Sequence, residues 1–529
     1  MTSNRRGYRG ALSAVPWILA AAAVSTPPLR AAAARPEVRV GTGRVSGVAA
    51  AGVVSFKGIP YAAPPIGELR WRPPAPPAAW AGVRDGASFG PTCPQMSRST
   101  DWTSSTSEDC LTVNVWKPQR HAAHALPVMV WIHGGAFISG ASALPWYDGA
   151  NLARHDVVVV SLNYRVGRLG FFAHPAITRT AGSDEMLGNY GFMDQVAALE
   201  WVQANIAAFG GDPKNVTIFG QSAGGSSVDM LMLAPPAKGL FAKAISQSGF
   251  PRWGGKPLRG VANSAEDNGV EFATQNHITG DSAETAAKLR ALPLRDVMES
   301  EPPIDIDRTT PEPIVDGRFL VGNAASLLID GKLAAVPLML GGTSCDASIF
   351  GDDYLASFTF AEPKGQPFES LYRGAPRDAT VEALTDRIET EPARFQARAH
   401  KATGQPVWVY YFDYRHEPRH AGECAGAPHA ADIPFVFGNL AATPLPGMAD
   451  QRSRLTTADR RLSKLLMQYW LSFARRGDPN GPGRPHWSAF DLEGEPVMVI
   501  SSKETAERLN YRKAQLDWIE SKLTQPAVW

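Results

Sequence analysis

Three short, almost purely apolar segments constrain the fold of this chain more than any other feature. They are residues 128–132 (VMVWI), 157–162 (VVVVSL) and 216–219 (VTIF). A strand with one solvated face alternates apolar and polar side chains, so continuous apolar runs are typical of strands buried on both faces. Helices on both sides of a mostly parallel sheet bury strands in this way, and the segments therefore predict an α/β architecture.

The segments between these runs have a helical period. In residues 193–209, apolar side chains recur at spacings of three and four, which we interpret as a core-facing stripe. Residues 336–340 and 407–412 are predicted to be strands, and residues 462–473 an amphipathic helix. No internal repeat or low-complexity linker follows the N-terminal region, so we predict a single large domain over residues 36–529 of the 529-residue chain.

The first 35 residues are interpreted as a signal peptide rather than as part of the fold. Arginines at positions 5, 6 and 9 precede an apolar run at residues 11–24, and alanines at 31–34 offer a cleavage site. The alternative is a transmembrane anchor, but the run is too short to cross about 30 Å of hydrocarbon and contains a proline. We therefore expect a secreted or periplasmic protein with no stable membrane anchor.

The charge balance indicates what kind of partner to expect. The chain has 52 basic and 51 acidic side chains, without the basic excess of a protein that binds nucleic acid. Its eleven histidines show no metal-ligand spacing such as H-E-x-x-H. We therefore expect a small-molecule substrate, with no metal and no organic cofactor.

The cysteines allow two disulfides. Cys93, Cys110, Cys345 and Cys424 are an even number in a chain expected to be exported, with three possible connectivities. Spacing favours Cys93 with Cys110, which would close a short loop rich in serine and threonine. Cys345 and Cys424 are then the remaining pair, and the alternative is that both are buried thiols.

The third apolar segment runs directly into a G-x-S-x-G pentapeptide, Gly220 to Gly224, with Ser222 at its centre. A serine on a sharp turn between a strand and a helix needs small neighbours, since larger side chains would clash with the adjoining elements. The alternative is an ordinary glycine-rich turn. The context favours a nucleophile, because residues 133–137 (HGGAF) follow another predicted strand and offer backbone N–H groups for an oxyanion hole.

Ser222 requires a base and an acid. His429 is the preferred base because it lies in a loop-like stretch well downstream of the serine, whereas His416 and His420 lie among arginines and are interpreted as solvated. Where a serine occupies such a turn, the order along the chain is nucleophile, acid, base. Asp346 fits the acid, since it follows the strand predicted at 336–340, with Asp352 and Asp353 as rivals.

Long motifs in a fixed order make the chain resemble the type-B carboxylesterases, the family of cholinesterases and para-nitrobenzyl esterases. They are FKGIPYAAPPIGELRWRPP at 56–74, EDCL at 108–111, HGGAF at 133–137, NYRVGRLGF at 163–171, GNYGFMDQ at 188–195, FGGDPKNVTIFGQSAGG at 209–225, FVFG at 435–438 and FARRGDPNGP at 473–482. The resemblance covers nearly all of the chain after residue 35. It implies an α/β-hydrolase fold, with a large, mostly parallel central sheet and helices on both faces, and the hydrolysis of carboxylic esters.

The resemblance also assigns site residues. It places the family's nucleophile on Ser222, its histidine on His429 and its acid on Asp346. The oxyanion donors fall on Gly135, Ala136 and Ala223. Cys93 and Cys110 fall on the family's short disulfide loop near the entrance of the active-site gorge.

Three features depart from the family pattern. The acid is usually glutamate, so the shorter Asp346 must lie closer to His429. A bridge from Cys345 to Cys424 could tie the two loops together. Gln221 stands where cholinesterases carry glutamate, which removes a negative charge that favours quaternary ammonium groups, so we predict that choline esters are not substrates.

The sequence thus predicts a secreted serine carboxylesterase that works through an acyl-enzyme. One alternative is a non-catalytic binding or adhesion module with the same fold, although such relatives lack an intact triad. Another is an amidase, lactonase or polyester hydrolase that uses the same triad. The aromatic residues Trp102, Phe137 and Trp146 fit core packing and substrate contact equally, and the sequence indicates neither the natural ester nor the oligomeric state.

Overall fold

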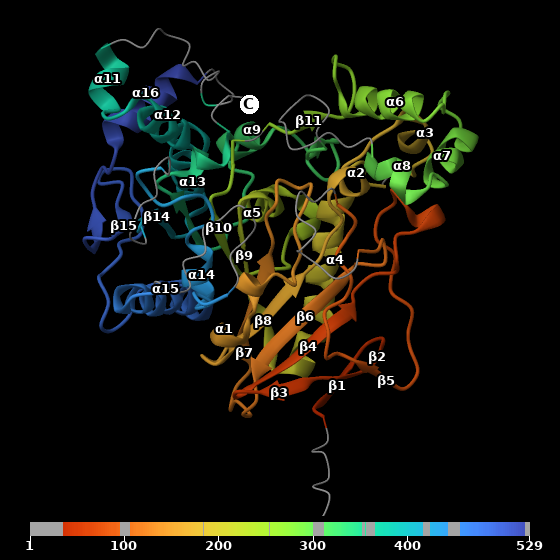
Figure 1. Ribbon diagram of the computed structural model, residues 1–529, viewed down its shortest axis with the longest axis horizontal. Coiled ribbons are helices and arrows are strands. Elements are labelled where there is room, and N and C mark those ends of the chain that lie inside the picture. The colour runs from red at the N-terminus through yellow and green to blue at the C-terminus, as the bar shows by residue number, and fades with distance from the viewer. Residues whose placement is uncertain are drawn as a thin grey trace, which may run out of the picture. The chain divides into compact units, whose positions relative to one another are not determined.

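The expected central sheet is present in the protein. The computed structural model describes residues 35–95, 106–183, 185–252, 254–299, 311–351, 355, 366–415, 424–442 and 455–523. In these residues eleven strands form one sheet in the order β16-β15-β14-β13-β10-β9-β7-β8-β6-β4-β3 (Figure 1). Their bounds are β3 (Val48–Ala50), β4 (Val53–Pro60), β6 (Thr112–Pro118), β7 (Leu126–Ile132), β8 (Val158–Leu162), β9 (Gly211–Gln221), β10 (Lys243–Gln247), β13 (Leu338–Thr343), β14 (Val407–Asp413), β15 (Val497–Ser501) and β16 (Thr505–Arg508).

The sheet is parallel in its middle and antiparallel at both edges. Each strand is parallel to the next in the run β8-β7-β9-β10-β13-β14-β15. The antiparallel pairs are β15 with β16 at one edge, and β8 with β6, β6 with β4 and β4 with β3 at the other. The prediction of a mostly parallel sheet is confirmed.

Helices follow most strands and cover both faces. Their bounds are α1 (Ala150–Ala153), α2 (Gly167–Gly170), α3 (Pro175–Thr178), α4 (Tyr190–Asn205), α5 (Ala223–Leu233), α6 (Ala265–Gln275), α7 (Ala283–Arg290), α8 (Leu294–Glu299), α9 (Ala324–Ile329), α11 (Gln366–Leu371), α12 (Pro376–Thr385), α13 (Glu391–His400), α14 (Ile433–Phe437), α15 (Thr457–Arg476) and α16 (Lys513–Lys522). Two small sheets, β1 (Glu37–Val40) with β2 (Gly43–Ser46) and β5 (Val83–Asp85), and β11 (Lys256–Pro257) with β12 (Ile314–Val315), lie outside the main one.

Strand β7 shows why the apolar runs are continuous. Val128, Val130 and Ile132 belong to the core that contains the apolar residues of α4 and α5. Met129 and Trp131 belong to a second core, formed with α14 and α15 on the other face. Each fully buried side chain of this kind contributes about 1.5–3 kcal/mol by leaving water, so a polar residue on either face of β7 would be costly.

Helix ends depend on capping residues that the periodicity does not show. Helix α15 extends beyond residues 462–473 because Thr456 and Asp459 form a capping box, in which each backbone N–H donates to the other's side chain. It ends at Gly477, whose φ of 72° allows the left-handed conformation of a C-cap. The helix predicted at 193–209 begins earlier, at Tyr190, and its last turn is the 3₁₀ segment η3 (Ile206–Phe209).

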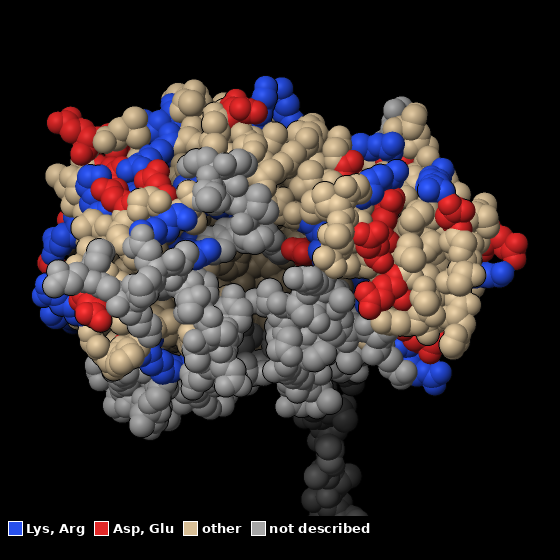
Figure 2. All heavy atoms as spheres, turned by 90° about the horizontal axis from the view of Figure 1, so that it is seen from above, with Lys and Arg blue, Asp and Glu red and all other residues tan. Residues whose placement is uncertain are grey.

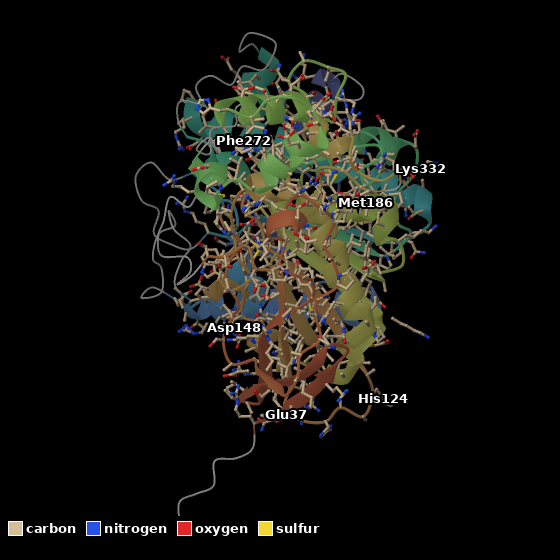
Figure 3. The ribbon with its side chains drawn as sticks, turned by 90° about the vertical axis from the view of Figure 1, so that its right-hand side faces the viewer. Glu37, His124, Asp148, Met186, Phe272 and Lys332 are labelled. Atoms are coloured by element: carbon tan, nitrogen blue, oxygen red, sulfur yellow. A yellow bond between two sulfur atoms is a disulfide. The ribbon has the colours of Figure 1, made fainter. Side chains whose placement is uncertain are left out.

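The carboxyl ends of the parallel strands meet at one edge of the sheet. In Figure 3, Glu37 in β1 and His124, shortly before β7, lie at the lower end, whereas Phe272 in α6 and Lys332 lie toward the upper end. Because β7 starts just after His124, it and its parallel neighbours run toward the upper end. In open α/β sheets, ligands bind beyond this edge.

Residues 36–529 form one compact unit. None of the described helices combines the length and the apolar character that a membrane span requires.

Candidate active site

Ser222 occupies a sharp turn between β9 and α5. Its φ of 60° and ψ of −128° are rarely adopted by residues with a side chain. The Ser222 N–H donates a 2.9 Å hydrogen bond to the carbonyl oxygen of Gln247, at the end of β10. Such a backbone costs on the order of 1–3 kcal/mol and persists where neighbouring structure enforces it. The turn leaves Ser222 partly exposed at the carboxyl edge of the sheet.

The glycines that flank Ser222 leave no room for side chains. A Cβ atom on Gly220 would lie 2.4 Å from the carbonyl oxygen of Gly224, and one on Gly224 would lie 2.1 Å from that of Ile132. Both obstacles are backbone atoms in the sheet and the helix, so they cannot rotate away. The small residues of the pentapeptide therefore have a steric cause.

The loop at residues 133–137 lies directly beside Ser222. A Cβ atom on Gly134 would lie 3.0 Å from the Cβ of Ser222. Gly135 and Ala136 follow with φ values of 115° and 54°, and Ala223 is the first residue of α5. Among the described residues, the backbone N–H groups of Gly135, Ala136 and Ala223 have no protein acceptor. They are thus available to a negatively charged oxygen beside Ser222.

His429 and Asp346 are hydrogen-bonded to each other. His429 Nδ1 donates to Oδ1 of Asp346, whose carboxylate is fully buried. The second oxygen, Oδ2, accepts hydrogen bonds from the hydroxyl of Ser248 at 2.7 Å and from the N–H of Thr343 at 3.0 Å. Asp346 opens the short 3₁₀ segment η5 (Asp346–Ile349) just after β13, so the shorter acid still reaches the imidazole.

Burial and charge oppose each other at this pair. Burial raises the pKa of Asp346, but His429 and the hydrogen bonds from Ser248 and Thr343 outweigh it, and the net pKa lies below the usual range. Burial lowers the pKa of His429, but the Asp346 carboxylate raises it, and the net pKa lies above the usual range. The pair therefore favours an ionised acid beside a histidine that readily accepts a proton.

A disulfide and a backbone hydrogen bond are among the contacts that join the loops carrying these residues. Cys345 and Cys424 form a disulfide, with their Cα atoms 6.4 Å apart. The Cys345 N–H also donates a 3.0 Å hydrogen bond to the carbonyl oxygen of Ala427. The positions of Asp346 and His429 are therefore coupled through both a covalent bond and the backbone.

The other ring nitrogen of His429 contacts Gln221. Nε2 of His429 lies 3.2 Å from the amide nitrogen of Gln221. Since Nδ1 donates to Asp346, Nε2 of the neutral ring is an acceptor and the amide donates to it. Within the described residues there is no hydrogen bond between His429 and the hydroxyl of Ser222. To act as a base toward Ser222, His429 must exchange the amide for that hydroxyl.

Polar residues that no sequence pattern identified support the histidine loop. Gln247 donates a 2.7 Å hydrogen bond to Oδ2 of Asp432, which also accepts one of 3.1 Å from the hydroxyl of Tyr410. Trp470 donates from Nε1 to Oε1 of Gln247 at 3.1 Å. Burial raises the pKa of Asp432 to about 6, although the Gln247 and Tyr410 hydrogen bonds lower it. These residues come from separate elements, so no local pattern signals them.

Other histidines have structural surroundings. Burial lowers the pKa of His133 to about 4, and its ring stacks on Tyr164. Burial likewise lowers the pKa of His400 to about 4, and its Nε2 donates to a backbone carbonyl. His174 Nδ1 accepts from the N–H of Ala176 and caps α3. The rival candidates Asp352, Asp353, His416 and His420 lie outside the described residues.

The remaining sequence candidates are two cysteines and three aromatic residues. Cys93 and Cys110 form a disulfide with Cα atoms 5.0 Å apart. Phe137 and Trp146 are buried among core residues, which matches the packing interpretation, and Trp102 lies outside the described residues.

On the face in Figure 2, the Lys and Arg side chains of the described residues lie among Asp and Glu side chains. The described residues hold no group of three or more His, Cys, Asp or Glu side chains arranged to bind a metal ion.

The sheet order, the helices on both faces and the serine turn after β9 define an α/β-hydrolase. The sequence profile of the carboxylesterase family matches residues 34–373 and 366–519. The chain therefore belongs to the carboxylesterase family.

Relatives and solved structures agree with this assignment. A fumonisin B1 esterase of Sphingopyxis macrogoltabida is 36% identical over 483 residues, which cover 87% of this chain and 86% of that protein. A para-nitrobenzyl esterase of Bacillus subtilis is 36% identical over 485 residues, covering 88% of this chain and 94% of that protein. A carboxylesterase of Geobacillus stearothermophilus has a similar structure, with a TM-score of 0.77 and 34% identity over 91% of this chain and 100% of its own. The predicted family and fold are confirmed, and the protein is a carboxylic ester hydrolase.

Proposed function

We propose that this hydrolase is a secreted enzyme that forms an acyl-enzyme on Ser222, with His429 as the base and Asp346 as the acid. The observation that carries the proposal is the hydrogen bond from His429 Nδ1 to the buried Asp346 carboxylate, at the sheet edge where the turn presents Ser222. A buried acid fixes the ring tautomer, so that Nε2 is left to accept a proton.

The reaction then has two halves. Ser222 Oγ attacks the ester carbonyl carbon while His429 Nε2 takes its proton, and His429 returns that proton to the departing alkoxide oxygen. A water molecule next gives a proton to His429 and attacks the acyl carbon. Ser222 leaves with the proton from His429, and the carboxylic acid is released.

The N–H groups of Gly135, Ala136 and Ala223 would hold the oxyanion in both halves. Each such donor is worth about 3 kcal/mol in the transition state because it is already oriented before charge develops. Their lack of protein acceptors in the described residues supports this role.

The proposed substrate is a small ester without a cationic alcohol group. Gln221 contacts the base through a neutral amide, where a carboxylate would attract a quaternary ammonium ion. The relatives are named for different esters, a fumonisin and a para-nitrobenzyl ester among them, so family membership fixes the bond cleaved rather than the alcohol.

The proposed location is outside the cytoplasm, with residues 36–529 as the mature domain. Two observations support export: the leader-like composition of the first 35 residues and the two disulfides, which are typical of oxidising compartments. Fractionation with N-terminal sequencing of the mature protein tests this point, and an uncleaved cytoplasmic protein would contradict it.

A fluorophosphonate probe tests the nucleophile. Wild type should be labelled, and the Ser222→Ala variant should stay unlabelled and lose on the order of 10⁶-fold in turnover while remaining folded. Ser521→Ala, at an exposed serine of α16, is the matched control and should behave as wild type. Near-wild-type turnover of Ser222→Ala would overturn the assignment.

A substrate panel separates the remaining chemistries. The panel holds para-nitrophenyl esters of increasing chain length, a choline ester, a lactone and an anilide. We expect the enzyme to hydrolyse the neutral esters fastest. A preference for the choline ester would contradict the role given to Gln221.

A further inference from the structure

A second buried carboxyl group lies beside Asp346. Glu389 belongs to the π-helical turn η6 (Asp386–Thr390) between α12 and α13, and its side chain is almost fully buried. A Cβ atom on Gly342 would lie 2.3 Å from the carboxyl carbon of Glu389 and 2.7 Å from Oδ2 of Asp346. Both carboxyl groups therefore contact the same glycine of β13.

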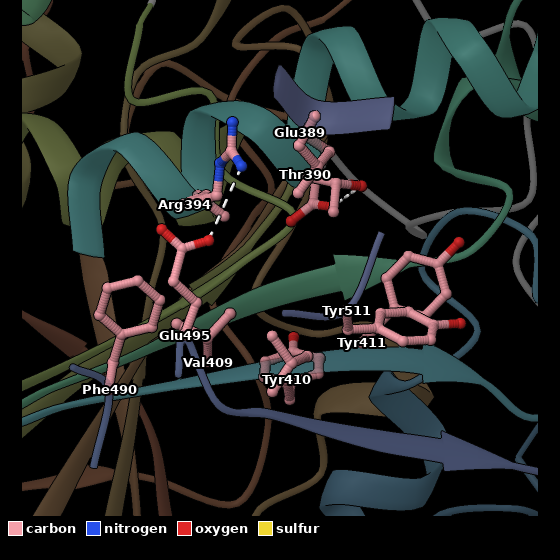
Figure 4. Close-up of a pocket in the computed structure, with 12 residues that line it drawn as sticks. Glu389, Thr390, Arg394, Val409, Tyr410, Tyr411, Phe490, Glu495 and Tyr511 are labelled. Atoms are coloured by element: carbon pink, nitrogen blue, oxygen red, sulfur yellow. Dashed lines mark hydrogen bonds and ion pairs between the residues drawn. The ribbon is translucent and has the colours of Figure 1, made fainter. Parts of the chain in front are cut away.

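The wide turn that presents Glu389 has a cause in the sequence. Pro392, near the start of α13, has no N–H to continue the hydrogen bonds of an α-helix. The N–H of Glu391 instead bonds the carbonyl of Asp386, five residues back. Turns of this kind are rare and recur at functional positions. Here the turn brings Glu389 against Gly342 of β13. Figure 4 shows Glu389 among the residues that line a small pocket.

The two carboxyl groups accept different numbers of hydrogen bonds. Asp346 accepts hydrogen bonds from His429, Ser248 and Thr343. Glu389 accepts only a long one, 3.3 Å, from the hydroxyl of its neighbour Thr390 within the described residues. Burial and the Asp346 charge raise the pKa of Glu389 well above the usual range of a glutamate. Of the two, Asp346 is therefore the carboxyl group that ionises more readily.

The other charged groups near Glu389 do not change this result. Its further acidic neighbours are Asp386 and Asp432, and both disfavour a negative charge on it. Glu389 also lines a cavity of about 20 Å³, room for about one water molecule. The polar and titratable side chains that line it are Thr390, Arg394, Glu495, Tyr410, Tyr411 and Tyr511. The cation among them, Arg394, is engaged with Glu495, Asp517 and Glu520.

We propose that Glu389 is a positioning residue for Asp346, an inference that rests on the proposed function. Its carboxyl group packs against Gly342 beside Oδ2 of Asp346. Oδ2 is then held toward Ser248 and Thr343, and Oδ1 toward His429. Burial and the Asp346 charge favour the protonated form of Glu389, and Asp346 is the carboxylate bonded to His429.

Two substitutions test the proposal. Glu389→Gln keeps the size and the neutral state, and it should retain turnover within about two-fold, with the acid limb of the pH profile in place. Glu389→Ala removes the packing, and its kcat should fall about 10- to 100-fold with little change in KM, as expected for a misplaced catalytic group. Rescue by glutamine distinguishes positioning from a general loss of structure, and thermal unfolding of both variants reports on stability.

Several results would overturn the proposal. If Glu389→Gln loses as much turnover as Glu389→Ala, or moves the acid limb to lower pH, then Glu389 acts as an anion. Wild-type kcat in Glu389→Ala would also contradict it. If the alanine variant does not fold, the pH profile of the glutamine variant decides. The Ser222→Ala variant, assayed in parallel, separates the two proposals. If it remains active, Ser222 is not the nucleophile, whatever the effect of the Glu389 substitutions.

Discussion

The disulfide between Cys345 and Cys424 joins the loop that carries Asp346 to the loop that carries His429. The two loops follow β13 and β14, which are parallel neighbours in the sheet. The bond therefore spans the carboxyl ends of adjacent strands, where a change in loop position would alter the distance between the acid and the base.

Removing this bond should affect both stability and turnover. In a Cys345→Ser, Cys424→Ser double variant, the free energy of unfolding should fall by about 2–4 kcal/mol, because the bond closes a loop of 79 residues. The kcat should fall as well, since the acid and base loops would lose their covalent link and be held by hydrogen bonds alone. Urea unfolding and ester hydrolysis measure the two effects.

The other disulfide provides the control. The bond between Cys93 and Cys110 joins neither of these loops, and its sequence separation is 17 residues. A Cys93→Ser, Cys110→Ser variant should therefore lose stability with a smaller loss in kcat. Equal losses of kcat in the two double variants would contradict a specific link to Asp346 and His429.

The contact between Gly134 and the serine turn predicts a steric effect. In Gly134→Ala, the new Cβ would lie 2.6 Å from the carbonyl oxygen of Gln221 and 3.0 Å from the Cβ of Ser222. The loop must then move away, taking the oxyanion donors with it, and kcat should fall about 100-fold. Gly351→Ala is the control, since no atom lies within 4 Å of its Cβ position. Equal kinetics for the two variants would argue against the loop's role.

Much of the fold could be predicted because its signals are local. The apolar runs at 128–132 and 157–162 are strands β7 and β8, and their lack of alternation follows from burial on both faces. The pentapeptide around Ser222 could be recognised because its small residues stand together directly after an apolar run, although the backbone atom that Gly224 approaches most closely belongs to Ile132 in β7. Burial pattern and residue size are properties that a short segment carries alone.

The supporting residues of the site could not be predicted in this way. Ser248, Asp432 and Glu389 lie in separate segments, after β10, before α14 and within η6, and none of them belongs to a recognisable motif. They reach Asp346 or the histidine loop only because the sheet brings the ends of β10, β13 and β14 side by side. Their contacts span long stretches of chain, so neither spacing nor periodicity identifies them.

The amide of Gln221 predicts a pH effect on the base. In Gln221→Glu, a carboxylate would lie beside Nε2 of His429 and favour its protonated form, raising a pKa that Asp346 already holds above the usual range. The acid limb of the kcat/KM profile should therefore move to higher pH, and activity near pH 6 should fall. Gln221→Met, neutral and of similar size, should leave that limb in place. A shift to lower pH in the glutamate variant would refute the sign of this interaction.

The hydroxyl of Ser248 predicts a loss that depends on pH. Ser248→Ala removes a 2.7 Å hydrogen bond to the buried Asp346 carboxylate, which should cost about 1–3 kcal/mol of stability near pH 7. The kcat should fall about ten-fold, since Asp346 would lose one of the contacts that orient it. Urea unfolding and steady-state kinetics on both proteins measure these losses.

The sign of the pH dependence follows from the pKa of Asp346, which the folded protein holds below the usual range. Its contribution to stability is complete above the unfolded pKa of about 3.9 and disappears as pH falls through the folded pKa. The stability difference between wild type and Ser248→Ala should therefore shrink in acid. Ser463→Ala is the matched control, because that buried hydroxyl donates to the backbone carbonyl of Phe435 at 2.9 Å and no carboxylate is involved. Its stability loss should stay constant with pH, and a constant loss in Ser248→Ala as well would show that the hydroxyl does not act through the Asp346 charge.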